Sequence, residues 1–225
     1  MPIWDNGNFC RDLLNIISNV ASEVFIIDST SVFTKSNPNI ALNELILVIK
    51  SLPIELNISL IGFALGGTLA QYLSCHLSAI NNVISISGPS FQTPELNKKL
   101  SQLIFKLKSN RTSEAMNLLC QWVDPKGISS TIAPKIPDHM LKEAQHRLLK
   151  GFTLLKHLDT RQYLLSYQGR YLSLVGSLSQ LANISNQVKP KNPLHSLLEI
   201  EHAGMRIWEN NPQSATKHIL NWIEK

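Results

Sequence analysis

The sequence has few cysteines and no long apolar run. Its 225 residues contain three cysteines, at positions 10, 75 and 120. Three thiols so far apart predict neither a disulfide framework nor a zinc site. No apolar run approaches the ~18 residues that a membrane helix needs, and the first residues lack the basic start of a secretory signal. These absences predict a cytoplasmic protein with no membrane attachment and no metal.

The chain also lacks the signatures of nucleic-acid binding. Its net charge is +5, and residues 91–160 account for it with eleven Lys and Arg against six Asp and Glu, while the remainder is neutral. No zinc or helix-turn-helix pattern accompanies these charges, and exposed aromatic residues are not interleaved with them. A basic segment of this kind predicts a solvated helical face or a docking surface for an acidic partner.

Residues 58–70, ISLIGFALGGTLA, have the pattern of a strand, a tight glycine turn and the start of a helix. The turn matches the Gly-x-Ser-x-Gly motif of a nucleophile elbow, which holds its central residue out into a cleft. Gly62 and Gly66 occupy the flanking positions, where a side chain is expected to collide with neighbouring backbone. Ala64 stands at the centre. Its methyl group cannot attack a carbonyl.

A second interpretation of this segment is a dinucleotide-binding turn or an ordinary strand-to-helix connection. A phosphate-binding Gly-x-Gly-x-x-Gly turn requires glycine two residues after Gly62, where this sequence has Ala64. No P-loop lysine follows either. The elbow is therefore favoured, and at this point the chain resembles the α/β-hydrolase family.

Strands alternate with helices along much of the sequence. The apolar run 23–28 is typical of a strand buried on both faces of a parallel sheet. A helix is expected over 38–52, with Asn37 as its N-cap residue. Another is expected from 212 to about 224. Further strands are expected at 82–87, 171–175 and 197–200. This alternation predicts an α/β fold with a mostly parallel sheet flanked by helices.

Between residues 94 and 159 the sequence predicts helices alone. One apolar stripe at helical spacing consists of leucines 96, 100, 103 and 107. A second stripe consists of residues 141, 144, 148, 152 and 155. The segment 94–159 is therefore expected to be a helical cap inserted into a core formed by residues 1–93 and 160–225.

Two segments narrow the resemblance. Residues 151–162, GFTLLKHLDTRQ, resemble the end of the cap in the esterases that demethylate pimeloyl-acyl-carrier-protein methyl ester in biotin synthesis. Residues 4–7, WDNG, resemble the segment after the first strands of that family. The resemblance implies an α/β-hydrolase fold whose first strands are missing here, with an exposed sheet edge as the result. It also implies carboxylic ester hydrolysis without a cofactor, by a monomer.

The resemblance places a substituted residue at each position of the catalytic triad. The family carries its acid in a Gly-x-x-Asp pattern after the strand at 171–175, where this sequence has Ser179. The general base is expected seven residues before Pro212, where this sequence has Met205. Together with Ala64 at the nucleophile position, these substitutions predict a protein without catalytic activity.

The resemblance implies roles for a few further residues. His202 is the one candidate for a replacement base, although a surface histidine is the more ordinary interpretation because Ser179 cannot hold its tautomer. Leu65 is expected to supply one N–H of the oxyanion hole. The loop that supplies the second N–H is expected to be missing from this sequence, and Trp4 is expected to lie at the cleft. An acidic acyl carrier protein is the implied partner of the basic cap. Its expected contacts are Lys142, Arg147 and Lys150.

Several functional interpretations remain open. The favoured one is a natural, non-catalytic relative of the esterase that retains the fold. A nucleophile-to-alanine variant of an active carboxylesterase explains Ala64 but leaves Ser179 and Met205 unexplained. An enzyme with rewired chemistry is the third interpretation, and a non-enzymatic interaction protein that uses its basic cap is the fourth.

Overall fold

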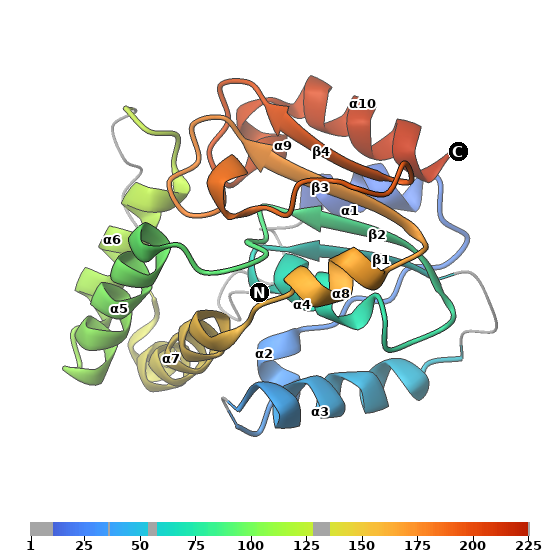
Figure 1. Cartoon of the computed structure of the whole chain (residues 1–225). Helices are drawn as coiled ribbons and strands as arrows, with labels where there is room; N and C mark the ends of the chain where they lie inside the picture. The colour runs from blue at the N-terminus through green and yellow to red at the C-terminus, as the bar shows by residue number, and fades with distance from the viewer. Residues whose placement is uncertain (1–10, 36, 54–57, 128–135, 225) are drawn as a thin grey trace.

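The computed structural model of the chain describes residues 11–35, 37–53, 58–127 and 136–224 (Figure 1). Its sheet has four parallel strands in the order β1-β2-β3-β4. The strands are β1 (Ile58–Phe63), β2 (Ile80–Ile86), β3 (Arg170–Gly176) and β4 (His195–Ile200). Phe63 is in register with Ile86, and Gly176 with Ile200. The loops that follow the strands therefore meet at one end of the sheet.

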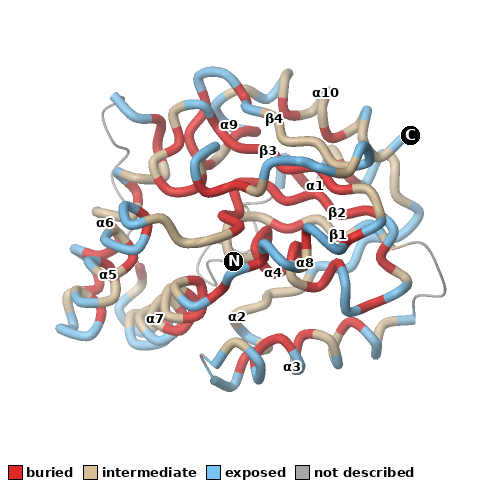
Figure 2. Tube along the Cα trace, in the orientation of Figure 1, coloured by how far each residue is buried: buried red, intermediate tan, exposed pale blue. Residues whose placement is uncertain are grey.

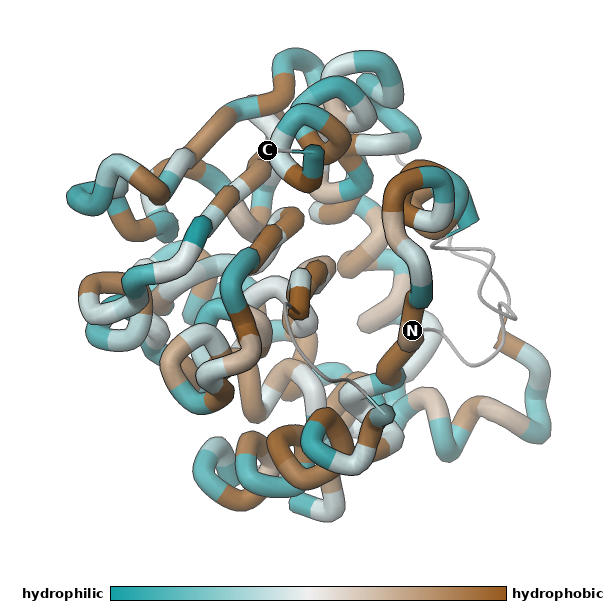
Figure 3. Tube along the Cα trace, turned by 90° about the vertical axis from the view of Figure 1, so that its right-hand side faces the viewer, coloured by the Kyte–Doolittle hydropathy of each residue, from teal (hydrophilic) through white to brown (hydrophobic). Residues whose placement is uncertain are grey.

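Helices cover both faces of this sheet. One layer consists of α3 (Pro38–Lys50), α4 (Leu65–Leu73) and α8 (Arg161–Ser166), with the short α2 (Ser29–Val32) beside it. The other consists of α1 (Arg11–Ser18), α9 (Ile207–Asn210) and α10 (Pro212–Ile223). The two inner strands, β2 and β3, are largely buried (Figure 2), and hydrophobic positions gather around the sheet in the view turned by 90° (Figure 3).

A group of helices stands beyond the carboxyl ends of the strands, in the segment between β2 and β3. It comprises α5 (Pro94–Lys108), α6 (Thr112–Val123), the 3-10 turn η3 (Asp138–Met140) and α7 (Leu141–His157). Figure 1 shows α5, α6 and α7 together on that side of the sheet. The four leucines of the first predicted stripe are all buried in α5. Helical periodicity thus identified the packed face of this helix.

Local sequence signals located most of the core elements. The predicted helix at 38–52 is α3. The Asn37 side chain accepts a hydrogen bond from the Ile40 N–H at 3.2 Å, as expected of the N-cap residue of this helix. The strands and the final helix also lie within a few residues of their predicted positions. No described helix combines the length and the apolar character needed to span a membrane.

The predicted strand at 23–28 is wrong. These residues form neither strand nor helix, and Val24, Phe25 and Ile26 are 39%, 38% and 57% exposed. Among the described residues β1 pairs with β2 alone and lies at the edge of the sheet. An apolar run becomes a buried strand only where a neighbouring strand receives it, and no described strand lies beside this one.

Candidate functional site

The turn after β1 has the backbone geometry of an elbow. Ala64 joins β1 to α4 with φ 51° and ψ −117°, a conformation that residues other than glycine rarely adopt. Its N–H donates to the Ile86 carbonyl at 2.9 Å, and its carbonyl accepts from the Thr68 N–H at 3.2 Å. The strained turn is therefore present with a methyl group at its apex.

Close backbone contacts explain two of the glycines around this turn. A Cβ at Gly62 would lie 2.1 Å from the Gly66 carbonyl oxygen. A Cβ at Gly67 would lie 2.8 Å from the Ser85 hydroxyl and 3.0 Å from the Gly88 Cα. The expected collision at Gly66 is not found, because that position faces open space with nothing within 4 Å. Gly62 and Gly67 are thus the residues that the tight turn requires.

The turn between β4 and α9 brings Met205 to the elbow. Met205 is 5% exposed and packs in an apolar cluster with Ala64 and Leu65. The Ser87 hydroxyl donates to the Met205 carbonyl at 2.7 Å, and Ser87 itself has a φ of 50°. The predicted base and nucleophile positions therefore belong to the same apolar cluster, and both carry groups that cannot transfer a proton.

Ser179 lies on the loop after β3. Its N–H donates to the Gly176 carbonyl at 3.0 Å, and its side chain is buried. The Ser179 hydroxyl has no hydrogen-bond partner in the described part of the chain. Its neighbours Leu181 and Ala182 belong to the same apolar cluster as Met205. The predicted acid position therefore holds a neutral hydroxyl without a described partner, two residues before the part of this loop that joins the cluster.

His202 is not gathered into this cluster. It is exposed, and its backbone has a φ of 59° at the turn after β4. Its N–H donates to the Ser177 hydroxyl at 3.1 Å. The turn thus directs Met205 into the interior and leaves His202 outside.

Apolar residues of the cap cover the elbow. They come from all three cap helices and are Leu96, Leu100, Leu119, Trp122, Val123, Phe152 and Leu155. A Cβ at Gly151 would lie 3.4 Å from Leu65 Cδ2, so α7 also approaches the start of α4 closely. The N–H of Leu65, at the first position of α4, has no acceptor within its own helix. Trp4 lies outside the described residues.

A short segment that begins at the last residue of α6, the cap strap (residues 123–126), joins the cap to both loops of the site. The Met205 N–H donates to the Val123 carbonyl at 2.9 Å, and the Lys126 N–H donates to the Leu178 carbonyl at 2.9 Å. A Cβ at Gly204 would lie 2.6 Å from the Val123 oxygen. The cap strap therefore lies directly on the loops that carry the acid and base positions.

Charged residues beside the cap strap were not found by sequence reasoning. Asp124 pairs with Arg206 at 3.6 Å, and Arg206 also pairs with Glu209 at 2.8 Å. Burial raises the pKa of the nearby Cys120 thiol, which keeps it protonated at neutral pH. Arg206 follows the base position directly in the sequence, and this adjacency was the one available signal.

Two of the three residues expected to contact a carrier are buried. Arg147 hydrogen-bonds the Asp28 carboxylate and the Ser31 hydroxyl, and the Lys150 ammonium donates to the Phe33 carbonyl. Burial alone would raise the pKa of Asp28, but the hydrogen bonds, chiefly from Arg147, lower it to about 2. The expectation of docking at Arg147 and Lys150 is therefore corrected, since both hold α7 against the segment around α2.

Lys142 is the exposed member of the predicted set. Burial lowers the pKa of Lys150, and the neighbouring Arg147 lowers it further.

Within the described residues no three His, Cys, Asp or Glu side chains gather in a way that could hold a metal ion.

Solved structures with this architecture are α/β hydrolases. An α/β hydrolase from a Medee basin deep-sea metagenome matches with a TM-score of 0.70 at 12% identity, covering 86% of this chain and 74% of its own. An esterase from Exiguobacterium antarcticum matches with a TM-score of 0.61 at 16% identity, and the match covers 85% of this chain and 75% of the esterase. A bromoperoxidase from Bacillus anthracis matches with a TM-score of 0.71 at 10% identity, and the match covers 97% of this chain and 88% of the bromoperoxidase. No protein-family model and no curated protein matches the sequence. The predicted α/β-hydrolase fold is thus confirmed.

Proposed function

We propose that the protein is a non-hydrolytic relative of the carboxylic ester hydrolases, and that its counterpart among them is the esterase of pimeloyl-acyl-carrier-protein methyl ester. The observation that carries the proposal is Ala64 at the apex of a strained elbow, packed with Met205 in one apolar cluster. An ester carbonyl at this place would meet a methyl and a thioether, and neither group forms an acyl bond or accepts a proton at neutral pH.

The surroundings of the elbow favour an apolar ligand. The cap contributes aliphatic and aromatic side chains to the cluster around Ala64. Apolar walls with few polar groups are typical of sites that hold acyl chains. In this proposal the scaffold binds an acyl group and leaves it intact.

A nucleophile-to-alanine variant of an active esterase is the competing function. Such a variant differs from the active enzyme at the apex alone, so it retains the acid and the base. Ser179 and Met205 stand at those positions here, and Ser179 has no hydrogen-bond partner in the described chain. The observations at these two residues therefore favour the non-hydrolytic relative.

The purified protein is expected to resist a fluorophosphonate probe. No side chain packed around Ala64 is an activated nucleophile, so intact-mass spectrometry should detect no adduct, and p-nitrophenyl butyrate should show neither a burst nor turnover above buffer. A serine esterase treated in parallel provides the positive control. An adduct mapped by peptide sequencing to any residue of the cluster around Ala64 would contradict the proposal.

The basic cap supplies a second candidate function, the docking of an acidic acyl carrier protein. Residues 91–160 carry eleven Lys and Arg against six Asp and Glu. Arg147 and Lys150 are buried, but four cap lysines are exposed, namely Lys98, Lys108, Lys126 and Lys142. Long-range attraction between these lysines and an acidic surface would accelerate association and weaken with added salt.

Charge reversal of the exposed cap lysines is expected to weaken binding of an acyl carrier protein. The variant carries Glu at positions 98, 108 and 142, and the loss should be about tenfold or more at low salt and smaller at high salt. Fluorescence anisotropy of a labelled carrier measures it. The matched control places Glu at the exposed core lysines 189, 191 and 217. Equal affinities of both variants for the carrier would contradict docking on the cap.

A further inference from the structure

The two chain connections between the core and the cap lie side by side. The chain leaves the core after β2, near Ser90, and returns to it near Thr160, before α8. The Thr160 N–H donates to the Ser90 carbonyl at 2.8 Å, and the Thr160 hydroxyl donates to the Gln71 side-chain oxygen of α4 at 2.6 Å. All three residues are fully buried. The two connections are therefore pinned to the core at one place, which we call the pivot (Ser90 and Thr160).

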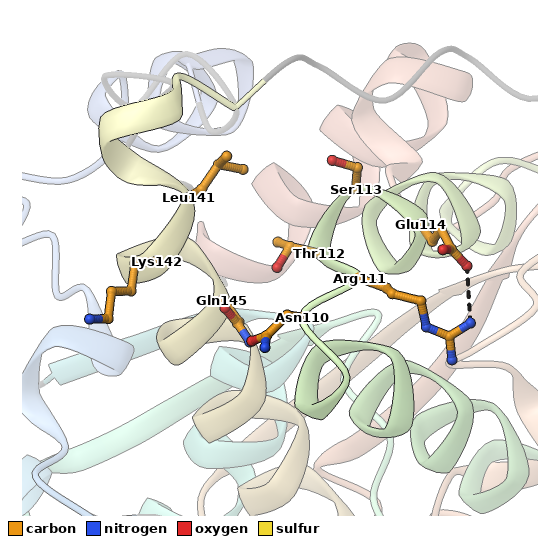
Figure 4. Close-up of a pocket in the computed structure, with 8 residues that line it drawn as sticks. All are labelled: Asn110, Arg111, Thr112, Ser113, Glu114, Leu141, Lys142 and Gln145. Carbon is orange, nitrogen blue, oxygen red and sulfur yellow. Dashed lines mark hydrogen bonds and ion pairs between the residues drawn. The ribbon is translucent and has the colours of Figure 1, made fainter.

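Contacts within the cap hold its helices together. Figure 4 shows where the start of α6 faces α7 around a hollow of about 440 Å³. The Gln145 side-chain amide of α7 donates to the Leu107 carbonyl at 2.6 Å and to the Asn110 side-chain oxygen at 2.9 Å. Glu114 of α6 pairs with Lys106 of α5 at 2.7 Å. The three helices also share apolar clusters of their own. The cap can therefore move as one body about the pivot.

Two buried charges fasten α7 to the segment around α2. Arg147 and Lys150 are 8% and 9% exposed. Arg147 pairs with the Asp28 carboxylate and donates to the Ser31 hydroxyl, which itself donates to Asp28 at 2.9 Å. The Lys150 ammonium donates to the Phe33 carbonyl. These five residues form a polar contact between the cap and the core, which we call the cap latch.

The cap latch and the cap strap hold different sides of the cap. The latch meets the segment around α2, which Figure 1 shows below β1. The strap meets the loops after β3 and β4, at the other end of the strand order. The pivot lies between them, because Ser90 follows β2. The latch is therefore the polar contact that closes the β1 side of the cap.

An ionic contact suits a closure that opens and forms again. Separating two apolar surfaces exposes hydrocarbon to water, whereas separated charges regain their hydration. The cost of desolvating the ions offsets much of their attraction in the closed state, so the net free energy of such a contact is small. Removing one partner has a larger effect, because the other charge then stays buried without a counter-ion. The latch can therefore hold the cap closed and still open reversibly.

We infer that the cap swings about the pivot as a lid, and that the cap latch holds this lid closed over the elbow. In the closed state, apolar residues of the cap cover Ala64 and Leu65. Breaking the latch frees α7 on the β1 side. Because the cap moves as one body, the contacts on the strap side open with it. The inference concerns access to the elbow, and it holds whether or not the elbow is catalytic.

Two native cysteines report the opening of the cap. Cys120 of α6 is buried, and the charges of Asp124 and Arg206 act on its thiol, so it lies on the strap side, away from the latch. Cys75, in the core after α4, is exposed. Labelling of the full-length protein with N-ethylmaleimide, followed by peptide mass spectrometry, measures both thiols in one sample. In the unmodified protein Cys75 should react rapidly and Cys120 slowly.

Arg147→Met is expected to accelerate the labelling of Cys120 about tenfold or more, because Asp28 loses its partner and the latch opens. The labelling rate of Cys75 should not change. Arg147→Lys keeps a charge opposite Asp28, so Cys120 should react more slowly in it than in Arg147→Met. Urea unfolding followed by circular dichroism measures the global stability of each variant. An acceleration at Cys120 no larger than the loss of global stability accounts for would overturn the inference.

Lys106→Met is the matched control, since it removes a cap charge whose partner, Glu114, also belongs to the cap. It should leave the labelling of Cys120 unchanged. Salt tests the latch without a substitution, because about 1 M sodium chloride screens its charges. It should accelerate Cys120 several-fold in the unmodified protein and have no such effect in Arg147→Met. Equal rates in the two Met variants, or a rate in the unmodified protein that does not respond to salt, would overturn the inference.

Discussion

Ala64→Ser alone is expected to leave the protein without esterase activity. The new hydroxyl would stand at the apex of the elbow, but Met205 offers it no base and Ser179 offers no carboxylate. A serine without a neighbouring base is a weak nucleophile at neutral pH. Hydrolysis of p-nitrophenyl butyrate by this variant should therefore equal that of the unmodified protein.

Rebuilding all three positions is expected to give a much larger effect. Ala64→Ser combined with Ser179→Asp and Met205→His should hydrolyse the ester at least about a thousandfold faster than Ala64→Ser, because triad residues act as a unit. The double variant that retains Ala64 is the matched control and should stay inactive. Probe labelling of the new serine provides a second measurement.

The opposite result would identify a different protein. A burst or turnover in Ala64→Ser alone would mean that a base and an acid already act on the elbow, and the nucleophile-to-alanine interpretation would then hold. His202 would be the first residue to examine, since it is exposed on the turn that carries Met205. Loss of the recovered activity on His202→Ala would identify it as the base.

Gly62→Ala is expected to destabilise the protein by about 3 kcal/mol or more. The added Cβ would lie 2.1 Å from the Gly66 carbonyl oxygen, which is backbone and has little room to move. The hydrogen bonds of Ala64 to Ile86 and Thr68 hold the turn on both sides. Urea unfolding followed by circular dichroism measures the change.

Gly66→Ala is the matched control for this change. It adds the same methyl group four residues later, within α4, where no atom lies within 4 Å. Replacing a helical glycine by alanine favours the helix, so stability should be unchanged or rise by up to about 1 kcal/mol. Equal destabilisation by both substitutions would mean that the turn is not the rigid elbow described above.

Local signals made much of the core predictable from the sequence. The helix N-cap Asn37 and Pro38 at the first turn of α3 act within a few residues, as do the glycines on either side of the β1–α4 turn. The apolar stripe of α5 needs no more than helical periodicity. The elbow with Ala64 at its centre was predictable for the same reason, because one short segment contains its whole geometry.

Contacts between distant segments were beyond the reach of such signals. The run 23–28 reads as a strand, but its state depends on a neighbour elsewhere in the chain. Arg147 and Lys150 read as a charged helical face, yet each meets a partner more than 100 residues away, around α2. A charge on a helix does not reveal whether another segment covers it.

The cap strap couples exposure of the elbow to motion of the cap. Two backbone hydrogen bonds join the cap strap to the loops of the site. The Met205 N–H donates to Val123 and links the strap to the β4–α9 turn, and the Lys126 N–H donates to Leu178 and links the strap to the loop after β3. Lifting the cap breaks both bonds together, so the strap and the two loops form a single cooperative opening unit. A molecule held over Ala64 would therefore slow hydrogen–deuterium exchange at both amides at once.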